Sequence, residues 1–178
     1  MMSILQLVRR DMAPLCTLGV IAANVLTKAL KLGVKMALPP VIWQRPVGST
    51  RNEEDPGFPS SHTSIMTFVC VYFAIYFRLH LGYSFAFATL VAIGPSSLMA
   101  AARIWDKDHT PLQTLAGLVW GSSLGAWWAL IGPRLRGILE WAEPQPWAMV
   151  VLCFAVGLPM FTKPLGVRLP GSPFLPKG

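Results

Sequence analysis

The chain has 178 residues, of which 53% are hydrophobic and 13% are charged, and its mean hydropathy is +0.51. Soluble globular proteins carry about 25% charged residues, and so small and apolar a chain would lack the polar surface that a soluble helical protein needs. The net charge of +7 indicates anionic lipid head groups or an anionic substrate rather than nucleic acid.

The first apolar segment predicts a helix that begins near Met12 and continues to about Ala37. Lys28, Lys31 and Lys35 occupy positions i, i+3 and i+7 and therefore share one face of this helix. Lysines in a spanning helix are costly unless they reach the membrane edge or face a polar cavity. Two interpretations stay open: plain anchoring at the membrane edge, or a basic stripe that faces an anion-holding cleft.

The segment from Pro39 to Phe58 is rich in proline, glycine and polar residues, which predicts a non-helical aqueous loop. It carries the pair Arg45-Pro46. A second helix is expected to begin at Pro59-Ser60, because proline in the first turn and serine at the N-cap are start signals. This helix ends near His80, which we interpret as an interfacial loop residue.

The third predicted helix runs from about Tyr83 to Ala102, with a kink at Pro95. After a short turn, a fourth helix begins at about His109-Thr110-Pro111, and its small residues permit close helix packing in lipid. A fifth helix is expected over roughly Trp147–Phe161. An irregular tail follows from Lys163 to Gly178.

Each apolar segment approaches the ~20 residues that cross a hydrocarbon core ~30 Å thick. The sequence therefore predicts an all-α fold: a polytopic membrane helical bundle of about five transmembrane helices, forming a single domain over residues 1–178. The three cysteines lie inside apolar segments without metal-like spacing, so we expect core packing and neither a disulfide nor a metal site. They are Cys16, Cys70 and Cys153.

Counting the predicted crossings tests whether the polar residues at the helix ends can meet. The first helix exits toward the proline-rich loop, the second starts on that side, and the third returns to it. Five residues spread over 65 positions therefore fall on one face of the membrane: Arg45, Ser60, His62, Arg103 and His109.

These residue types suit phosphate chemistry. Arginine's planar fork binds phosphate oxygens, and a helix N-terminus offers backbone N–H groups to an anion. One histidine can attack phosphorus while a second protonates the leaving oxygen and then activates water. No carboxylate cluster indicates a required metal, and we expect no cofactor.

The three blocks that carry these residues resemble the type 2 phosphatidic acid phosphatase (PAP2) superfamily of membrane lipid phosphatases, whose core is shared with haloperoxidases. The family pattern is Lys, six residues and Arg-Pro, then Pro-Ser-Gly-His, then Ser-Arg, five residues, His, three residues and Asp. This chain has Arg45-Pro46, then Pro59-Ser60-Ser61-His62, then Ala102-Arg103, with His109 and Gln113 at the last two positions. The resemblance covers about residues 35–125.

The chain departs from that pattern at four positions. Leu38 stands where the family has its lysine, and we expect Lys35, one turn earlier, to take its place. Ser61 replaces the glycine, and Ala102 replaces the serine. Gln113 replaces the aspartate that would orient the nucleophilic histidine, and a neutral carboxamide can still accept a hydrogen bond from the imidazole.

The Gly-x-Pro-Ser-Ser-His block and the His-x-x-x-Gln ending are similar to the dolichyl-diphosphatase branch. The resemblance implies hydrolysis of a polyprenyl diphosphate to the monophosphate, with His109 as nucleophile and His62 as acid and base. Arg45, Ser60, Ser61 and Arg103 would bind phosphate. It implies a membrane location, in the endoplasmic reticulum of a eukaryote or the inner membrane of a bacterium.

Three alternatives stay open. The chain could be another lipid phosphatase of this superfamily, acting on phosphatidate, phosphatidylglycerophosphate or undecaprenyl diphosphate. It could be a catalytically weak or inactive lipid-binding membrane protein, as Leu38, Ala102 and Gln113 suggest. Vanadate-dependent haloperoxidase chemistry uses the same scaffold, but the lack of a soluble surface argues against it.

Overall fold

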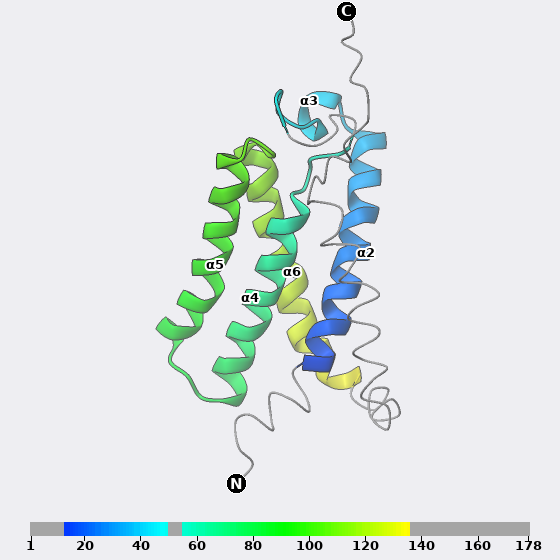
Figure 1. Cartoon of the computed structure of the whole chain (residues 1–178). Helices are drawn as coiled ribbons and strands as arrows, with labels where there is room; N and C mark the ends of the chain where they lie inside the picture. Colours follow the sequence, from blue (N-terminus) through cyan, green and yellow to red (C-terminus); the bar gives the residue numbers. More distant parts are fainter. Residues whose placement is uncertain (1–12, 50–54, 136–178) are drawn as a thin grey trace, which may run out of the picture. The chain divides into compact units, whose positions relative to one another are not determined.

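The described part of the chain, residues 13–49 and 55–135 of a computed structural model, is helical, without strands. Figure 1 shows the helices in chain order. They are α2 (Ala13–Ala37), α3 (Pro40–Trp43), α4 (Ser61–His80), α5 (Phe85–Trp105), α6 (Pro111–Ile131) and the 3₁₀ turn η2 (Gly132–Leu135).

Four segments are long and apolar enough to cross a membrane: Leu15–Ala37, Ser61–His80, Phe85–Trp105 and Pro111–Arg134. They confirm the first four predicted spans and the all-α membrane bundle. The fifth predicted helix, Trp147–Phe161, the predicted tail and Cys153 lie outside the described residues. Cys16 and Cys70 are buried, which agrees with the predicted core packing.

Helix α4 is the centre of the described bundle. It packs mainly against α6 and α5, and α2 contacts it as well (Figure 1). Three glycines spaced four residues apart on α6 line its contact with α4, and each meets a backbone carbonyl of α4 or its cap: Gly117, Gly121 and Gly125. A Cβ atom added at Gly117 would lie 2.8 Å from the Ser60 oxygen. The predicted small-residue face of α6 is therefore the α4 contact.

The apolar core joins α2, α4 and α6 through Leu15, Phe68, Tyr72 and Trp128, among other side chains. Trp128 contributes more than apolar area, because its indole Nε1–H donates to the Leu15 carbonyl at 2.8 Å. Burying an indole without an acceptor is costly, so this bond fixes where the start of α2 meets the end of α6.

The Pro39–Phe58 segment differs from the sequence prediction, because it contains the short helix α3. Pro40 at the first helical position has the required φ and lacks only an N–H that would be unpaired there. The Trp43 ring is buried, and its Nε1–H donates to the Leu38 carbonyl at 3.1 Å. The loop then returns to this helix, since the Gly57 N–H donates to the Trp43 carbonyl at 2.6 Å.

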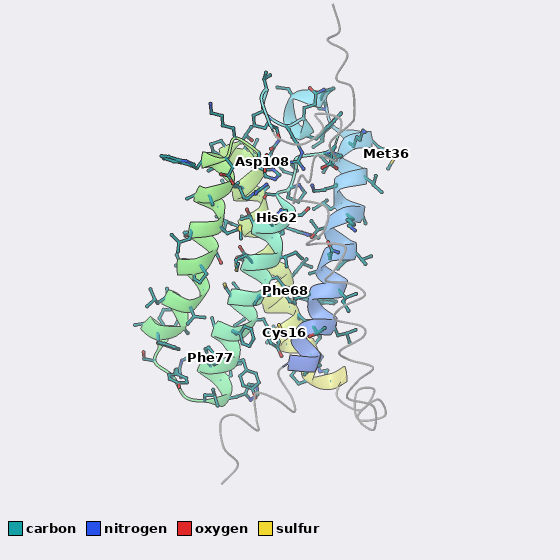
Figure 2. The ribbon with its side chains drawn as sticks, in the orientation of Figure 1. Cys16, Met36, His62, Phe68, Phe77 and Asp108 are labelled. Carbon is teal, nitrogen blue, oxygen red and sulfur yellow. The ribbon has the colours of Figure 1, made fainter. Side chains whose placement is uncertain are left out.

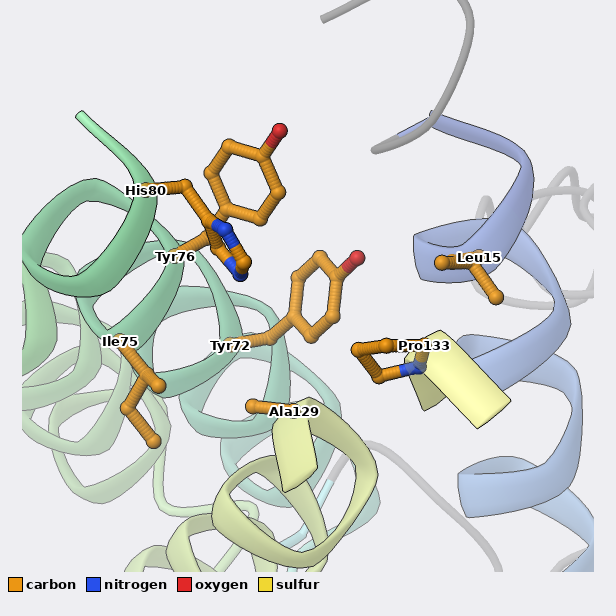
Figure 3. Close-up of a pocket in the computed structure, with 7 residues that line it drawn as sticks. All are labelled: Leu15, Tyr72, Ile75, Tyr76, His80, Ala129 and Pro133. Atoms are coloured by element: carbon orange, nitrogen blue, oxygen red, sulfur yellow. The ribbon is translucent and has the colours of Figure 1, made fainter. Parts of the chain in front are cut away.

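Figure 3 shows a small pocket at the end of α4 formed by Tyr72, Tyr76 and His80, with Leu15, Ile75, Ala129 and Pro133 completing its lining. His80 is the last residue of α4 and is exposed, with its ring centroid 4.5 Å from that of Tyr76. The ring is therefore part of the helix end rather than of a loop, and it lies at the other end of α4 from His62.

Candidate active site

Segments that are far apart in the sequence meet at one end of the bundle. The end of α2, the loop that carries α3, the start of α4 and the α5–α6 turn lie together there (Figure 1). Figure 2 shows His62 in the first turn of α4 and Asp108 in the α5–α6 turn near this end. The crossing count predicted this arrangement, and it brings the two histidines and the two arginines to the same region.

His109 and Arg45 form the centre of the site. Both are buried, with 3% and 6% of their surfaces exposed. Arg45 Nη1 lies 3.3 Å from His109 Nε2 and donates to the Asp108 carbonyl at 3.1 Å. The guanidinium therefore contacts both the imidazole and the backbone just before it, although the two residues are 64 positions apart.

The arginine contact assigns the histidine tautomer. A guanidinium can only donate hydrogen bonds, so Nε2 accepts and Nδ1 carries the hydrogen. His109 Nδ1 is buried and has no hydrogen-bond partner among the described residues. The nitrogen that carries the lone pair is thus the one that accepts from the guanidinium.

The surroundings of His109 favour the neutral imidazole. The pKa of His109 is lowered from 6.5 to about 3, and burial is the largest cause. The positive charges of Arg45, Lys31 and Arg103 act in the same direction. Because the pKa lies well below neutrality, the ring is unprotonated at physiological pH. Its Nε2 lone pair accepts from Arg45 and can attack an electrophile once this guanidinium donates to the ligand instead.

Asp108 organises the α5–α6 turn from the residue next to His109. Its buried carboxylate pairs with Arg103 Nη2, and Ser49 donates to its other oxygen at 3.2 Å. Arg103 also lies 3.7 Å from Asp106, and its carbonyl accepts the His109 N–H at 3.2 Å. Asp108 therefore acts on Arg103 and the loop near Ser49, and these contacts do not involve the His109 ring.

Arg45, like Arg103, has a carboxylate partner. Arg45 Nη2 donates to Asp55 at 2.7 Å, and the Asp55 side chain is half exposed. A phosphoryl group has the same kind of oxygen acceptors as these carboxylates. Asp55 and Asp108 thus occupy hydrogen-bonding positions on the arginines that an anionic ligand would compete for.

Gln113 is fully buried and joins two parts of the site. Its Nε2 donates to the carbonyls of Gln44 and Ile42 at 2.6 and 3.3 Å. Its Oε1 accepts the Thr110 N–H at 3.1 Å, and its own N–H donates to the Thr110 hydroxyl at 3.3 Å. This reciprocal pair is a capping box, which starts α6 at Pro111.

These contacts explain why glutamine occupies this position. An aspartate has no N–H to offer the two loop carbonyls and would place a negative charge beside them. Gln113 also acts on His109, because its side chain raises the pKa of the ring against the larger lowering effects. Its well-formed hydrogen bonds nevertheless go to Thr110 and the α3 loop, so an orienting role toward the imidazole stays a prediction.

The start of α4 lies at the predicted place but differs in its contacts. Ser60 is the N-cap residue, yet its side chain does not cap the helix. It is fully buried, its hydroxyl accepts from Thr63 at 3.0 Å, and its N–H donates to the Gln113 carbonyl at 3.0 Å. Ser61 and His62 are partly exposed in the first turn. Phosphate binding by Ser60 and Ser61 stays a prediction.

The three lysines of α2 have different environments, so the proposed basic stripe is not uniform. Lys31 is buried, and its ammonium donates to the Pro56 carbonyl at 2.6 Å. Lys28 and Lys35 are exposed. The Lys35 ammonium lies 5.3 Å from the centroid of the Trp43 ring, within the range of a cation–π contact.

The fold and the site together define a membrane helical bundle with a neutral histidine and two arginines at one end. Comparison with known proteins agrees with that class: the PAP2 superfamily profile matches residues 14–136. This match covers more than half of the chain and includes every residue of the site. The chain therefore belongs to the PAP2 superfamily.

A curated relative is lipid phosphate phosphatase epsilon 2, chloroplastic, from Arabidopsis thaliana. The two are 31% identical over 127 residues, which is 68% of this chain and 41% of the relative. The chain thus spans about two fifths of the length of the relative that it matches. No solved structure matches the chain significantly.

Sequence reasoning did not predict several contacts of the site. The Thr110-x-x-Gln113 spacing is a capping-box signal that was available in the sequence. Asp55 and Asp108 lack such a signal, because an ion pair between Arg45 and Asp55 depends on how the loop folds. The burial of Lys31, rather than Lys35, depends on which part of α2 faces the loop.

Proposed function

We propose that the chain is a membrane lipid phosphatase in which His109 receives the phosphoryl group. The observation that carries this proposal is the 3.3 Å contact between His109 Nε2 and Arg45 Nη1 at the end of an apolar bundle. It combines an unprotonated nucleophile with a cation that binds phosphate oxygens, at the end of helices apolar enough to span a membrane.

The reaction has two steps. Nε2 of His109 attacks phosphorus, the bond between phosphorus and the lipid-side oxygen breaks, and His62 gives that oxygen a proton. His62 then takes a proton from water, which attacks the phosphohistidine, breaks the nitrogen–phosphorus bond and releases inorganic phosphate. The pKa of His109 near 3 keeps this nucleophile neutral over the whole physiological range.

The proposed phosphate ligands are Arg45 and Arg103, with Ser60 and Ser61 at the start of α4. An arriving phosphoryl group exchanges with Asp55 on Arg45 and with Asp108 on Arg103, since each arginine has more than one donor to share. Arginine and histidine donors supply the charge neutralisation in this scheme, so we expect the reaction to proceed without a divalent metal.

For the substrate we propose a polyprenyl diphosphate of the dolichyl type, which is hydrolysed to the monophosphate. The Gly57-x-Pro59-Ser60-Ser61-His62 block and Gln113 support it through their similarity to the dolichyl-diphosphatase branch. The relative's name points to lipid phosphates more broadly. Phosphatidate, phosphatidylglycerophosphate and undecaprenyl diphosphate are therefore the competing substrates.

A substrate panel tests this function. The full chain, purified in detergent, is given each of these lipids with and without EDTA, and released phosphate is measured. We expect release from a lipid diphosphate that EDTA does not reduce and that falls at least about 10³-fold in His109→Ala, as removal of a covalent nucleophile does. Activity that survives in His109→Ala, or that needs magnesium, would contradict the mechanism.

One observation favours a second candidate, a lipid-binding protein with little or no turnover. His109 Nδ1 is buried without an acceptor among the described residues, and an acceptor there would stabilise the imidazolium-like character of the phosphohistidine. In that case the panel gives no phosphate release from any lipid, while binding of the same lipids persists.

A further inference from the structure

Lys31 is a buried cation that belongs to the lysine face of α2 and lies outside the three blocks of the family pattern. It lies inside the spanning part of α2 and has 9% of its surface exposed. The other two lysines of the same face, Lys28 and Lys35, are exposed. Burying an ammonium in a spanning helix is costly, and such residues are commonly kept because they contact a substrate or ion.

Its contacts connect Lys31 to the site. The ammonium donates to the Pro56 carbonyl at 2.6 Å, and the preceding residue, Asp55, holds Arg45 at 2.7 Å. Arg45 in turn contacts His109. Two hydrogen bonds, joined through the neighbouring residues Asp55 and Pro56, therefore connect the lysine to the guanidinium at the centre of the site.

The charge of Lys31 also reaches His109. Its positive charge contributes to lowering the pKa of the ring, after burial and Arg45 and ahead of Arg103. A positive charge that disfavours a protonated imidazole favours an anion bound beside that imidazole.

We propose that Lys31 binds the phosphate or diphosphate group of the substrate together with Arg45. This inference rests on the proposed function. It is an alternative to the prediction that Lys35 replaces the lysine missing at Leu38. The ammonium of Lys35 lies over the Trp43 ring, on an exposed side chain, whereas Lys31 lies seven residues before Leu38 on the buried side of the same helix.

The competing explanation is that Lys31 only ties the Pro56 loop to α2. Two substitutions separate the possibilities. Lys31→Gln keeps an N–H donor for the Pro56 carbonyl and removes the charge, and Lys31→Arg keeps both. A hydrogen bond that only anchors the loop needs the N–H donor of residue 31, whereas phosphate binding needs its positive charge. Lys28→Met is the control for removing an exposed lysine from the same helix.

The experiment titrates inorganic phosphate into each full-length variant in detergent by calorimetry, and follows the His109 ring by NMR as a function of pH. Melting temperature and size-exclusion elution show that each variant is folded. We expect Lys31→Gln to bind phosphate about 10- to 100-fold more weakly and to have a higher His109 pKa. Lys31→Arg and Lys28→Met should bind close to wild type.

Phosphate affinity and a His109 pKa that are unchanged in Lys31→Gln would overturn the inference. A loss of affinity in Lys35→Met with none in Lys31→Gln would overturn it too, in favour of the sequence-based assignment. The titration needs no turnover. A wild-type chain that binds phosphate through Lys31 but hydrolyses no lipid would therefore contradict the proposed function and leave this inference standing.

Discussion

At the scale of single residues, Gln113 has the clearest physical explanation. It replaces a carboxylate of the family pattern, and its carboxamide satisfies two loop carbonyls that a carboxylate would leave unpaired. Gly57 lies so close that a Cβ atom there would come within 2.7 Å of the Gln113 Oε1 atom. The glutamine and the loop therefore fit each other, and the departure from the pattern has a structural role.

Restoring the family residue should therefore destabilise the chain. Gln113→Asp removes both donors to Ile42 and Gln44 and the side-chain half of the capping box, so we expect a loss of about 2–4 kcal/mol, from about 1–3 kcal/mol for each buried group left unpaired. Thermal unfolding in detergent measures it. Gln44→Ala is the control, since its exposed side chain is removed while its carbonyl stays. A Gln113→Asp variant as stable as wild type would contradict this reading.

At the scale of elements, the contact between α4 and α6 holds the two histidine-bearing helix starts together. His62 lies in the first turn of α4, and His109 lies two residues before α6. Because glycines let the α6 backbone approach α4 closely, the spacing of these helices sets the spacing of the two starts. Packing in the middle of the bundle thereby determines site geometry.

A pair of glycine substitutions tests this packing. In Gly121→Ala the new methyl group meets the backbone carbonyl of Ser64, which cannot move aside as a flexible side chain would. We expect a destabilisation of about 1–3 kcal/mol together with reduced phosphate release. Gly94→Ala, in α5, meets nothing within 4 Å and should be neutral or slightly stabilising. Equal melting temperatures for the two variants would contradict the inference that α4 and α6 pack closely at Gly121.

The elements also show what sequence reasoning can reach. Apolar segment length and helix start signals predicted α2, α4, α5 and α6 within a few residues of their ends, because these features act locally. The helix α3 was missed, since four residues in a proline-rich loop carry little periodicity. Pro95 was correctly placed inside α5, where Ser96 donates to the Ala92 carbonyl at 2.7 Å.

At the scale of the whole molecule, the crossing count was enough to bring Arg45, His62, Arg103 and His109 to one end of the bundle. Which cation is buried and which carboxylate pairs with which arginine could not be predicted. Those outcomes depend on how the loop before α4 folds onto α2, as the contacts of Lys31, Asp55 and Gln113 show. The sequence thus predicts the location of the site better than its internal pairing.

The most direct test of the account is to trap the phosphorylated protein. The lipid that the protein hydrolyses fastest in the panel is labelled with ³²P in the phosphoryl group that is released. The reaction of the protein with this lipid is quenched with alkaline detergent within the first turnover. The account predicts ³²P on a peptide that contains His109, stable to base and labile to acid, and absent from His109→Ala. An active wild-type chain that carries no label, or a label that persists in His109→Ala, would contradict it.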